Sequence, residues 1–214
     1  MADLALVDLV VPVKHLDRAK SRLRGAVPGG LDAHRALVLA VVSDTIGAAL
    51  AAPGVRRVLV VCEDSRVVEA LAGTGAECVD ERGLPGLNAA LRFGARRLRA
   101  DDPRVAVGAL QADLPAARPS DIDEAITEAD GRRAFVADRP GTGTALLIGA
   151  PGEPLAPRFG QGSATAHARD AARVGDHLPY LRCDVDTPDD LTLARDLGLG
   201  PRTARVLEAT CRVC

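Results

Sequence analysis

Two carboxylates placed two residues apart are the first candidates for chemistry in this chain. They lie in the stretch Leu181-Arg182-Cys183-Asp184-Val185-Asp186-Thr187-Pro188. If its apolar start is a strand, residues i and i+2 point to one side, so Asp184 and Asp186 face the same spot. Thr187-Pro188 then ends the strand and begins a helix. The pair suits Mg²⁺, which takes one or two carboxylates plus substrate phosphates; the pair alone would equally fit a solvated turn with a capping Asp.

A third carboxylate, Asp113, follows the apolar run Val105–Leu110, which is predicted to be a buried strand. Ligands of open α/β sheets bind beyond the carboxyl ends of the strands, and Asp113 falls at such an end. Taken alone, Asp113 would also suit a turn. Together with Asp184 and Asp186 it makes a candidate three-carboxylate metal site.

Basic residues crowd the connection that follows the first predicted strand, Leu4–Val13. This connection holds a single acid, Asp17, and five bases, which are Lys14, Arg18, Lys20, Arg22 and Arg24. A single Lys or Arg there would be an ordinary solvated side chain, but the cluster favours a polyphosphate partner. The chain contains neither G-x-G-x-x-G nor G-x-x-x-x-G-K-[ST], so it carries no dinucleotide fingerprint and no P-loop.

Glycine-bearing loops are further candidates for ligand contacts. Gly141-Thr142-Gly143-Thr144 offers amides and hydroxyls to an anion, unless it is a plain hairpin turn. The loop Pro157–Ser163 precedes a predicted helix, with Ser163 as N-cap and free amides for a phosphate or carboxylate. Asn88 either caps a helix or hydrogen-bonds a nucleobase edge. His167 is expected to be exposed or paired with an anion rather than to act as a base.

Strands and helices alternate along the first 130 residues, which predicts a parallel, three-layer α/β domain. Closely spaced strands in the second half indicate a small antiparallel excursion that covers the pocket. The single domain is expected to span residues 1–206, with a tail at 207–214. The predicted strands are Leu4–Val13, Val58–Cys62, Ala76–Val79, Val105–Leu110, Ala134–Ala137 and Ala145–Ile148; the predicted helices are Asp32–Leu50, Ser65–Leu71, Ala89–Arg99, Asp121–Ala129, Ala164–Arg173 and Pro188–Leu197.

Composition narrows the classes of partner. Of the 214 residues 47% are hydrophobic but only 2% aromatic, and the net charge is −2. Nucleic-acid binding is not expected, because the chain has no basic field and almost no rings on which bases could stack. No signal peptide and no apolar run near the roughly 20 residues of a membrane span are apparent, so a soluble cytoplasmic protein is predicted. Cys211 and Cys214 form a lone C-x-x-C pair, for which a frayed tail is the favoured interpretation.

Several motifs together closely resemble one family, the phosphoenolpyruvate or 2-phospho-L-lactate guanylyltransferases of the pathway that makes the deazaflavin coenzyme factor 420. The resemblance covers nearly the whole chain, from Leu4 to about Val206. Ala112 stands where the pattern has Gly before the Asp, and the terminal C-x-x-C lies outside the pattern. The motifs are Pro12-Val13-Lys14 with Ala19-Lys20-Ser21-Arg22-Leu23, Leu87-Asn88, Leu110–Pro115, Phe135–Arg139 with Gly141–Thr144, Pro157–Gly160 with Ser163, and Arg182–Pro188.

The resemblance implies a Rossmann-like nucleotide-diphospho-sugar transferase fold with a mixed, mostly parallel sheet. It implies GTP as donor and a small phosphorylated three-carbon acid as acceptor, which would be phosphoenolpyruvate, 2-phospho-L-lactate or 3-phosphoglycerate. A homodimer is compatible with it. The site residues that match the family are Asp113, Asp184 and Asp186 for Mg²⁺, Thr144, Gly160 and Ser163 for the acceptor acid, and Lys14 and Lys20 for the nucleotide phosphates.

The chemistry of such a transfer agrees with these residues. A phosphate acceptor is already ionised at neutral pH, so the reaction needs charge cancellation and in-line placement rather than a protein nucleophile. Lys14, Lys20 and Arg22 would stabilise the leaving pyrophosphate. Two alternatives stay open: a molybdopterin or sugar-phosphate nucleotidyltransferase of the same fold, and a catalytically silent nucleotide-binding module. All three Asp are present, which speaks against the silent module.

Overall fold

A mixed β-sheet forms the centre of the protein in the computed structural model, which describes residues 6–80 and 83–211. Seven strands of this part of the chain pair in the order β3-β2-β1-β4-β6-β5-β7. Neighbours among β1 to β4 run parallel, β6 is antiparallel to both β4 and β5, and β5 is parallel to β7. The strands are β1 (Val7–Pro12), β2 (Val55–Val61), β3 (Glu77–Val79), β4 (Ala106–Leu110), β5 (Ala134–Ala137), β6 (Thr144–Ile148) and β7 (Ala172–Arg173).

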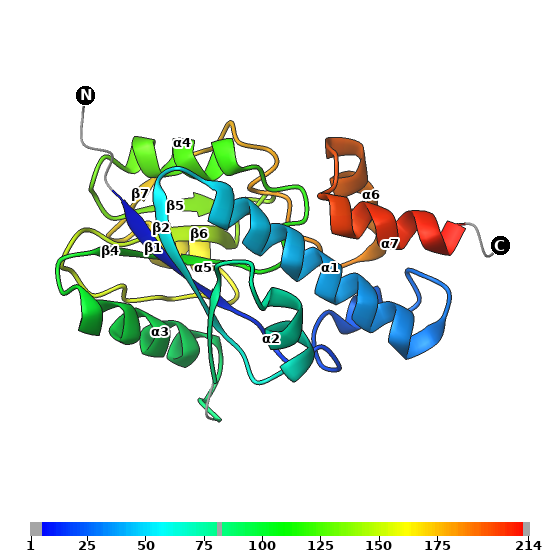
Figure 1. Ribbon diagram of the computed structural model, residues 1–214. Helices are drawn as coiled ribbons and strands as arrows, with labels where there is room; N and C mark the ends of the chain where they lie inside the picture. The colour runs from blue at the N-terminus through cyan, green and yellow to red at the C-terminus, as the bar shows by residue number, and fades with distance from the viewer. Residues whose placement is uncertain (1–5, 81–82, 212–214) are drawn as a thin grey trace.

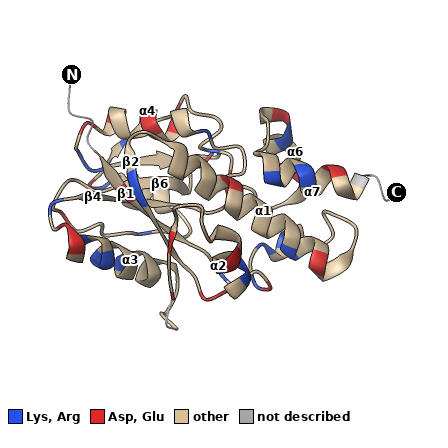
Figure 2. Cartoon of the chain, viewed as in Figure 1, with Lys and Arg blue, Asp and Glu red and all other residues tan. Residues whose placement is uncertain are grey.

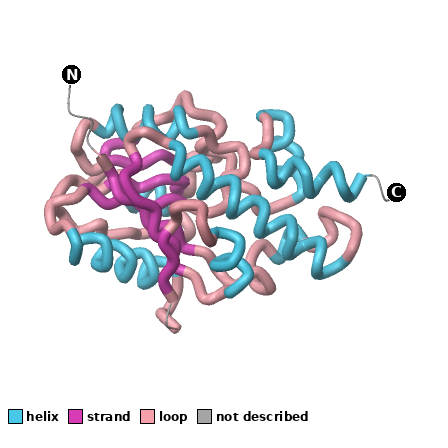
Figure 3. Tube along the Cα trace, viewed as in Figure 1, coloured by secondary structure: helices cyan, strands magenta, loops and turns pink. Residues whose placement is uncertain are grey.

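Helices cover both faces of the sheet, as Figures 1 and 3 show. α3 packs on one face against β1, β2 and β4, with α5 beside it on β5, and α1, α2 and α4 share the other face. α6 and α7 lie at the far end of α1, where a third apolar cluster joins them. The helices are α1 (Gly30–Ala51), α2 (Ser65–Leu71), α3 (Leu87–Asp101), α4 (Pro119–Ala129), α5 (Ser163–His167), α6 (Pro188–Leu197) and α7 (Pro201–Cys211), with a 3₁₀ turn at Ser21–Leu23.

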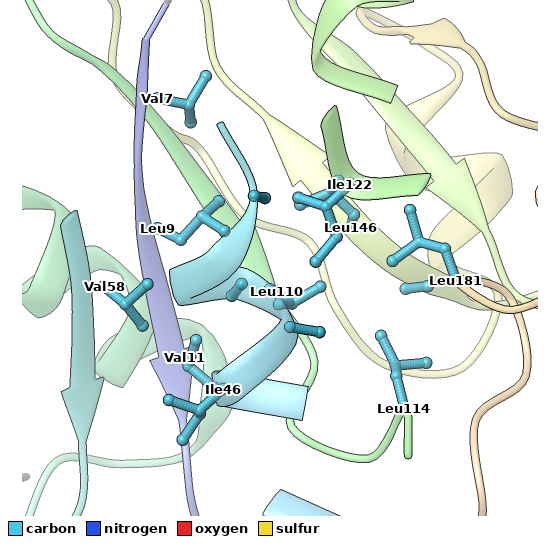
Figure 4. Packing of buried hydrophobic residues seen from close by; sticks show 14 of the residues in the cluster. Val7, Leu9, Val11, Ile46, Val58, Leu110, Leu114, Ile122, Leu146 and Leu181 are labelled. Carbon is cyan, nitrogen blue, oxygen red and sulfur yellow. The ribbon is translucent and has the colours of Figure 1, made fainter. Parts of the chain in front are cut away.

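β1 lies inside the sheet, between β2 and β4, and both of its faces carry apolar side chains. Leu9 and Val11 point into the cluster under α1 and α4, whereas Val10 points into the cluster under α3. Figure 4 shows the first of these clusters, where Leu9 and Val11 lie among side chains from α1, α4 and neighbouring strands. Full burial of one such aliphatic side chain stabilises the fold by roughly 1.5–3 kcal/mol. The fold therefore anchors the loop that leaves the carboxyl end of β1.

Charged residues lie mostly on the helices and loops around a largely uncharged sheet (Figure 2). Asp8 in β1 is an exception, since its side chain is completely buried. The guanidinium of Arg56 donates to both of its oxygens, from Nε and Nη2, at 2.8 Å each. This bidentate pairing supplies the hydrogen bonds that a buried carboxylate requires.

α1 is long and apolar enough, by length and composition alone, to cross a membrane. More than half of its most apolar window is nevertheless buried inside the protein. It packs against β2, α2, α4 and α7, and its side chains Leu37, Val38 and Ile46 are within 3% of complete burial. These contacts are those of a central core helix.

The structure departs from the predicted elements in several places. The stretch that carries Asp184 and Asp186 is not a strand, since residues 181–187 form turns and an extended loop. The helix predicted at Ala164–Arg173 ends at His167, and Ala172–Arg173 forms β7 instead. Gly162 rather than Ser163 is the N-cap of α5. The predicted domain end at residue 206 falls within α7, while Leu4 and Cys214 lie outside the described residues.

Gly94 in α3 allows this helix to approach the sheet closely. A Cβ at this position would lie 2.5 Å from Val10 Cγ1 and 3.0 Å from Val61 Cγ2. We expect Gly94→Ala to lower the free energy of unfolding by about 1–3 kcal/mol, because the added methyl overpacks the interface between α3 and the sheet. Urea unfolding followed by circular dichroism measures this change.

Gly47→Ala in α1 is the matched control. Gly47 is exposed, and a Cβ there would meet nothing within 4 Å. This change should raise the free energy of unfolding by about 0.5–1 kcal/mol, as expected for replacing Gly with Ala inside a helix. Equal effects of the two substitutions would contradict the close approach of α3.

Candidate active site

The predicted site residues gather where the parallel strands β1, β2 and β4 end. The loop after β1 carries Lys14 and Lys20, and the loop after β4 carries Asp113. β6 runs antiparallel to β4, with Leu110 paired to Leu146, so its first residue Thr144 begins at the same edge. The topology therefore collects residues from four distant segments, including the loop that carries Asp184 and Asp186.

Lys20 lies between two of the predicted metal ligands. Its Nζ donates to Asp113 Oδ2 and to Asp186 Oδ1. Its backbone is left-handed, with φ 51°, an uncommon conformation for a non-glycine residue. Burial disfavours the charge on Lys20, but the two carboxylates outweigh it and hold the pKa of its ammonium above the usual value.

Asp184 is the most perturbed carboxyl of the group. Burial, followed by the charges of Asp113, Asp138 and Asp186, raises the pKa of Asp184 to about 7. Lys20 acts in the opposite direction but does not cancel these effects. The site therefore has an excess of negative charge that one lysine does not neutralise.

The carboxylates offer a place for a hard cation. Asp113 Oδ1 is buried and has no hydrogen-bond partner among the described residues, so a lone pair is left for another ligand. Asp113, Asp138, Asp184 and Asp186 also line one small cavity. In this structure their oxygens do not form a closed set of metal ligands.

Another cluster of possible metal ligands lies elsewhere. Among the described residues, the set whose ligand atoms all lie within 4.8 Å of one another is Glu124, Glu128 and His177. In this set His177 Nε2 and Glu124 Oε1 form an exposed ion pair of 2.7 Å.

Backbone contacts hold the loop of Asp184 and Asp186 in place. Val185 N–H donates to the carbonyl of Asp113 at 3.0 Å, which ties the two loops together. Thr187 caps α6, and Asp190 Oδ2 accepts from Asp186 N–H at 3.1 Å and Thr187 N–H at 2.8 Å. This capping box confirms that α6 begins at Thr187-Pro188 and fixes the backbone of Asp186.

Asp138 closes the Gly-Thr-Gly-Thr loop on itself. Its Oδ1 accepts from Thr142 N–H at 2.8 Å, and its Oδ2 accepts from Gly143 N–H at 2.7 Å. A Cβ on Gly143 would lie 2.3 Å from Asp138 Oδ2, so only glycine fits this close approach. The amides that the sequence offered to an anion are thus already used, which corrects that prediction.

A cavity of about 240 Å³ opens beside Asp113 and Asp186. Aliphatic side chains of α1, β2 and α3 form its walls. Its rim carries the ammonium and guanidinium groups of Lys14, Arg18 and Lys20. The wall residues include Val38, Val41, Val42, Val61, Leu87 and Ala90.

A second cavity, of about 170 Å³, adjoins the first. It shares Leu87, Gln111, Asp113 and Asp186 with the first cavity. Thr144, Gly160 and Ser163 line it together with the four carboxylates, and no lysine or arginine is among the described residues of its lining. An anion in this cavity would therefore meet neutral donors on one side and acids on the other.

Two residues predicted to contact substrate, Asn88 and Arg22, make other contacts in the structure. Asn88 neither caps α3, whose N-cap is Gly86, nor offers its amide to a ligand. Its Nδ2 donates to the Phe159 carbonyl and its Oδ1 accepts from Phe159 N–H, both at 2.9 Å, so it holds the Pro157–Ser163 loop. Arg22 is exposed and lines a separate cavity with Arg139 beside Asp184 and Asp186.

Three further residues were not singled out for roles at the site by the sequence. Asp138 contributes a fourth carboxylate, and its spacing of four and five residues from Thr142 and Gly143 is a signal for a side-chain-closed turn. Gln111 lies in the lining of both cavities. His167, expected to be exposed, is completely buried and hydrogen-bonded to Thr144.

Comparison with known proteins identifies the family of this chain. Residues 7–197 match the family model described as guanylyl transferase CofC like. A phosphoenolpyruvate guanylyltransferase of Salinispora arenicola is 49% identical over 201 residues, covering 92% of this chain and 91% of that protein. One of Streptomyces scabiei is 50% identical over 204 residues, covering 92% and 93%.

A solved structure from Desulfovibrio desulfuricans, described as a nucleotide-diphospho-sugar transferase, matches with a TM-score of 0.69 at 18% identity, covering 95% of this chain and 94% of that one. At this identity the likeness shows the fold alone, and it confirms the predicted fold class. The family match over most of the chain confirms the resemblance drawn from the motifs. The chain therefore belongs to the guanylyl transferase CofC-like family.

Proposed function

We propose that the protein transfers GMP from GTP to phosphoenolpyruvate and releases pyrophosphate, in the biosynthesis of the deazaflavin coenzyme factor 420. The observation that carries this proposal is the pair of cavities that meet at Asp113 and Asp186. Two anionic substrates, one in each cavity, would bring their phosphates together beside these carboxylates. The relatives named phosphoenolpyruvate guanylyltransferase support the choice of substrates.

The cavity of about 240 Å³, which we call the nucleotide-side cavity, suits GTP in its shape and charge. Its aliphatic walls accept a nucleobase and ribose, and the cationic rim of Lys14, Arg18 and Lys20 suits a triphosphate. Lys20 is paired with Asp113 and Asp186 and also lines this cavity, so a short side-chain movement brings its ammonium to a phosphate.

The second cavity, of about 170 Å³, which we call the acceptor-side cavity, suits a small acid. It is smaller than the nucleotide-side cavity, which agrees with a small acceptor. The hydroxyls of Thr144 and Ser163 and the backbone of Gly160 form the part of the lining that can donate to its carboxylate or phosphate. Gly160 has φ 135°, a conformation that favours glycine. The named relatives make phosphoenolpyruvate the first choice over 2-phospho-L-lactate.

Mg²⁺ fits the carboxylates between the two cavities. Asp113, Asp184 and Asp186 would hold it, as the unpartnered Asp113 Oδ1 and the uncompensated negative charge of the group indicate. A bound divalent cation would supply charge neutralisation between the phosphates of donor and acceptor. Without such a cation, a doubly charged acid beside four carboxylates would be strongly repelled.

The protein's own groups would bind and orient. An oxygen of the acceptor phosphate attacks the α-phosphorus of GTP, and the bond from that phosphorus to the oxygen bridging to the β-phosphate breaks, releasing pyrophosphate. The attacking oxygen is already anionic near neutral pH, so no side chain has to remove a proton. Lys14, Lys20 and Arg18 are placed to stabilise the charge that develops on the pyrophosphate.

The first prediction concerns the reaction itself. Pyrophosphate should be released only when GTP, Mg²⁺ and phosphoenolpyruvate are all present. Asp113→Asn and Asp186→Asn should each lower kcat/KM by at least about 100-fold, the usual scale for removing one preorganised electrostatic group. A coupled pyrophosphate assay, with 2-phospho-L-lactate and 3-phosphoglycerate tested in parallel, measures these effects.

Asp189→Asn is the matched control, because Asp189 is an exposed carboxylate in the first turn of α6, three residues beyond Asp186. It should retain full activity. Absence of turnover with all three phospho-acids would overturn the proposed function, and full activity of Asp113→Asn would overturn the metal site.

A second prediction follows from the raised pKa of Asp184. It is tested on the protein in the presence of a metal chelator. The folded protein keeps the Asp184 proton up to about pH 7, whereas the unfolded chain releases it near the ordinary carboxyl pKa of 3.8. The contribution of this bound proton to the free energy of unfolding is therefore largest below about pH 4 and is lost as the pH rises to 7. Asp184→Asn keeps a neutral side chain at every pH, so it should be more stable than wild type at pH 8.

The expected gain at pH 8 amounts to a few kcal/mol at most, since each pKa unit corresponds to about 1.4 kcal/mol. Urea unfolding of both proteins at pH 5 and pH 8 measures it, with Asp189→Asn as a control whose difference from wild type should not change with pH. A stability difference for Asp184→Asn that is the same at both pH values would show that Asp184 is not held protonated.

A further inference from the structure

His167 is a completely buried polar side chain that the proposed mechanism does not use. It is the last residue of α5, and its ring packs against Phe159 and Phe135 at centroid distances of 5.1 and 6.1 Å. It is not among the residues that line the acceptor-side cavity. It meets two residues of that lining: the ring of Phe159, and Thr144, whose Oγ1 lies 2.9 Å from His167 Nδ1.

The tautomer of His167 follows from its other hydrogen bond. Arg158 N–H donates to His167 Nε2 at 2.9 Å, so Nε2 offers a lone pair and carries no proton. Burial, with the charges of Arg133 and Arg158, lowers the pKa of His167 to about 4, although Asp170 acts in the opposite direction. The ring is therefore neutral at pH 7, its proton lies on Nδ1, and Nδ1–H donates to Thr144 Oγ1.

The hydrogen bond from His167 Nδ1–H to Thr144 Oγ1 determines how the hydroxyl hydrogens of Thr144 and Ser163 are oriented. Ser163 Oγ lies 3.1 Å from Thr144 Oγ1, so one of the two hydroxyls donates to the other. Because His167 gives a proton to Thr144 and takes none, the pair always has one O–H left over. Whichever hydroxyl keeps it, that hydrogen belongs to a side chain that lines the acceptor-side cavity.

The opposite tautomer would remove this donor. With the proton on Nε2, Thr144 would have to donate to Nδ1, and Ser163 would donate to Thr144. A hydroxyl hydrogen would then reach the cavity only if the bond between Ser163 and Thr144 broke. The backbone of Arg158 excludes this state, since its N–H would face another N–H.

We propose that His167 is a positioning residue that directs one hydroxyl hydrogen of the Thr144–Ser163 pair into the acceptor-side cavity and thereby sets the affinity for the anionic acceptor. The proposal rests on the proposed function for the identity of that acceptor. The cavity has no lysine or arginine among its described lining residues. A neutral donor whose hydrogen is already oriented therefore contributes to the affinity for the acid.

Two isosteric substitutions separate this role from simple support of the loop. His167→Asn places an amide N–H near the position of Nδ1 and gives up the acceptor for Arg158. His167→Gln places a carbonyl near the position of Nε2 and gives up the donor to Thr144. His167→Phe fills the volume and gives up both.

The His167 variants should differ from one another in KM for phosphoenolpyruvate, measured with the full-length protein, GTP and Mg²⁺. His167→Gln and His167→Phe should raise KM for phosphoenolpyruvate about 10-fold or more, the scale for one hydrogen bond to a charged group. His167→Asn should stay within about 3-fold of wild type, and KM for GTP should stay unchanged in all three. Equal KM values for His167→Asn and His167→Gln would overturn the proposal.

A second measurement does not depend on turnover. Nitrogen-15 spectra of the ¹⁵N-histidine-labelled wild type at pH 7 should show His167 with a protonated Nδ1 and an unprotonated Nε2. The reverse pattern would overturn the proposal whatever the substrate. The expected pattern in a protein that releases no pyrophosphate with any phospho-acid would instead overturn only the proposed function.

Discussion

Electrostatic repulsion among four carboxylates is the constraint on which the rest of the site depends. Asp113, Asp138, Asp184 and Asp186 line one small cavity. Their mutual repulsion, added to burial, is strong enough to raise the pKa of Asp184 to about 7. The ammonium of Lys20 relieves part of this repulsion through Asp113 and Asp186. Carboxyl groups whose pKa values are perturbed in this way cluster at functional sites, which supports the cation site that we propose.

The fold stabilises this arrangement by fixing each carboxylate separately. The backbone of Asp186 is held by the capping box of α6, and that of Asp113 by the N–H of Val185. Asp138 is held by two amides of its own turn. These local hydrogen bonds are anchored in turn by β1 and β4, whose side chains are buried on both faces of the sheet. The energy of core packing therefore maintains a site that is unfavourable by itself.

Sequence reasoning succeeds where a pattern has one physical cause. Near-continuous apolar runs at Leu4–Val13 and Val105–Leu110 predict strands buried on both faces, and the structure has strands at Val7–Pro12 and Ala106–Leu110. Pro188 after Thr187 predicts the start of α6 at the observed residue. The position of Asp113 after β4 is likewise confirmed, because a strand end fixes where the next loop begins.

Sequence reasoning fails where a tertiary contact replaces a local one. The apolar start at Leu181 predicts a strand, but Val185 pairs with the carbonyl of Asp113 instead of with a neighbouring strand. His167 is predicted to be exposed or paired with an anion, yet it is buried beside the rings of Phe135 and Phe159. Asn88 has a plausible cap position, but its amide pairs with a backbone 71 residues away. Periodicity and spacing carry no information on such partners.

The neutral donors of the acceptor-side cavity are a consequence of its charge. A lysine or arginine placed there would pair with the nearest carboxylates, as Lys20 does with Asp113 and Asp186. Neutral hydroxyls are attracted far less, but their hydrogens rotate freely unless something sets them. A buried, neutral imidazole between a backbone N–H and Thr144 sets them without adding charge. The hydrogen-bonded chain from Arg158 through His167 to Thr144 and Ser163 therefore complements the carboxylate group. The carboxylates give the cavity its charge, and this chain orients the hydroxyl hydrogens that line it.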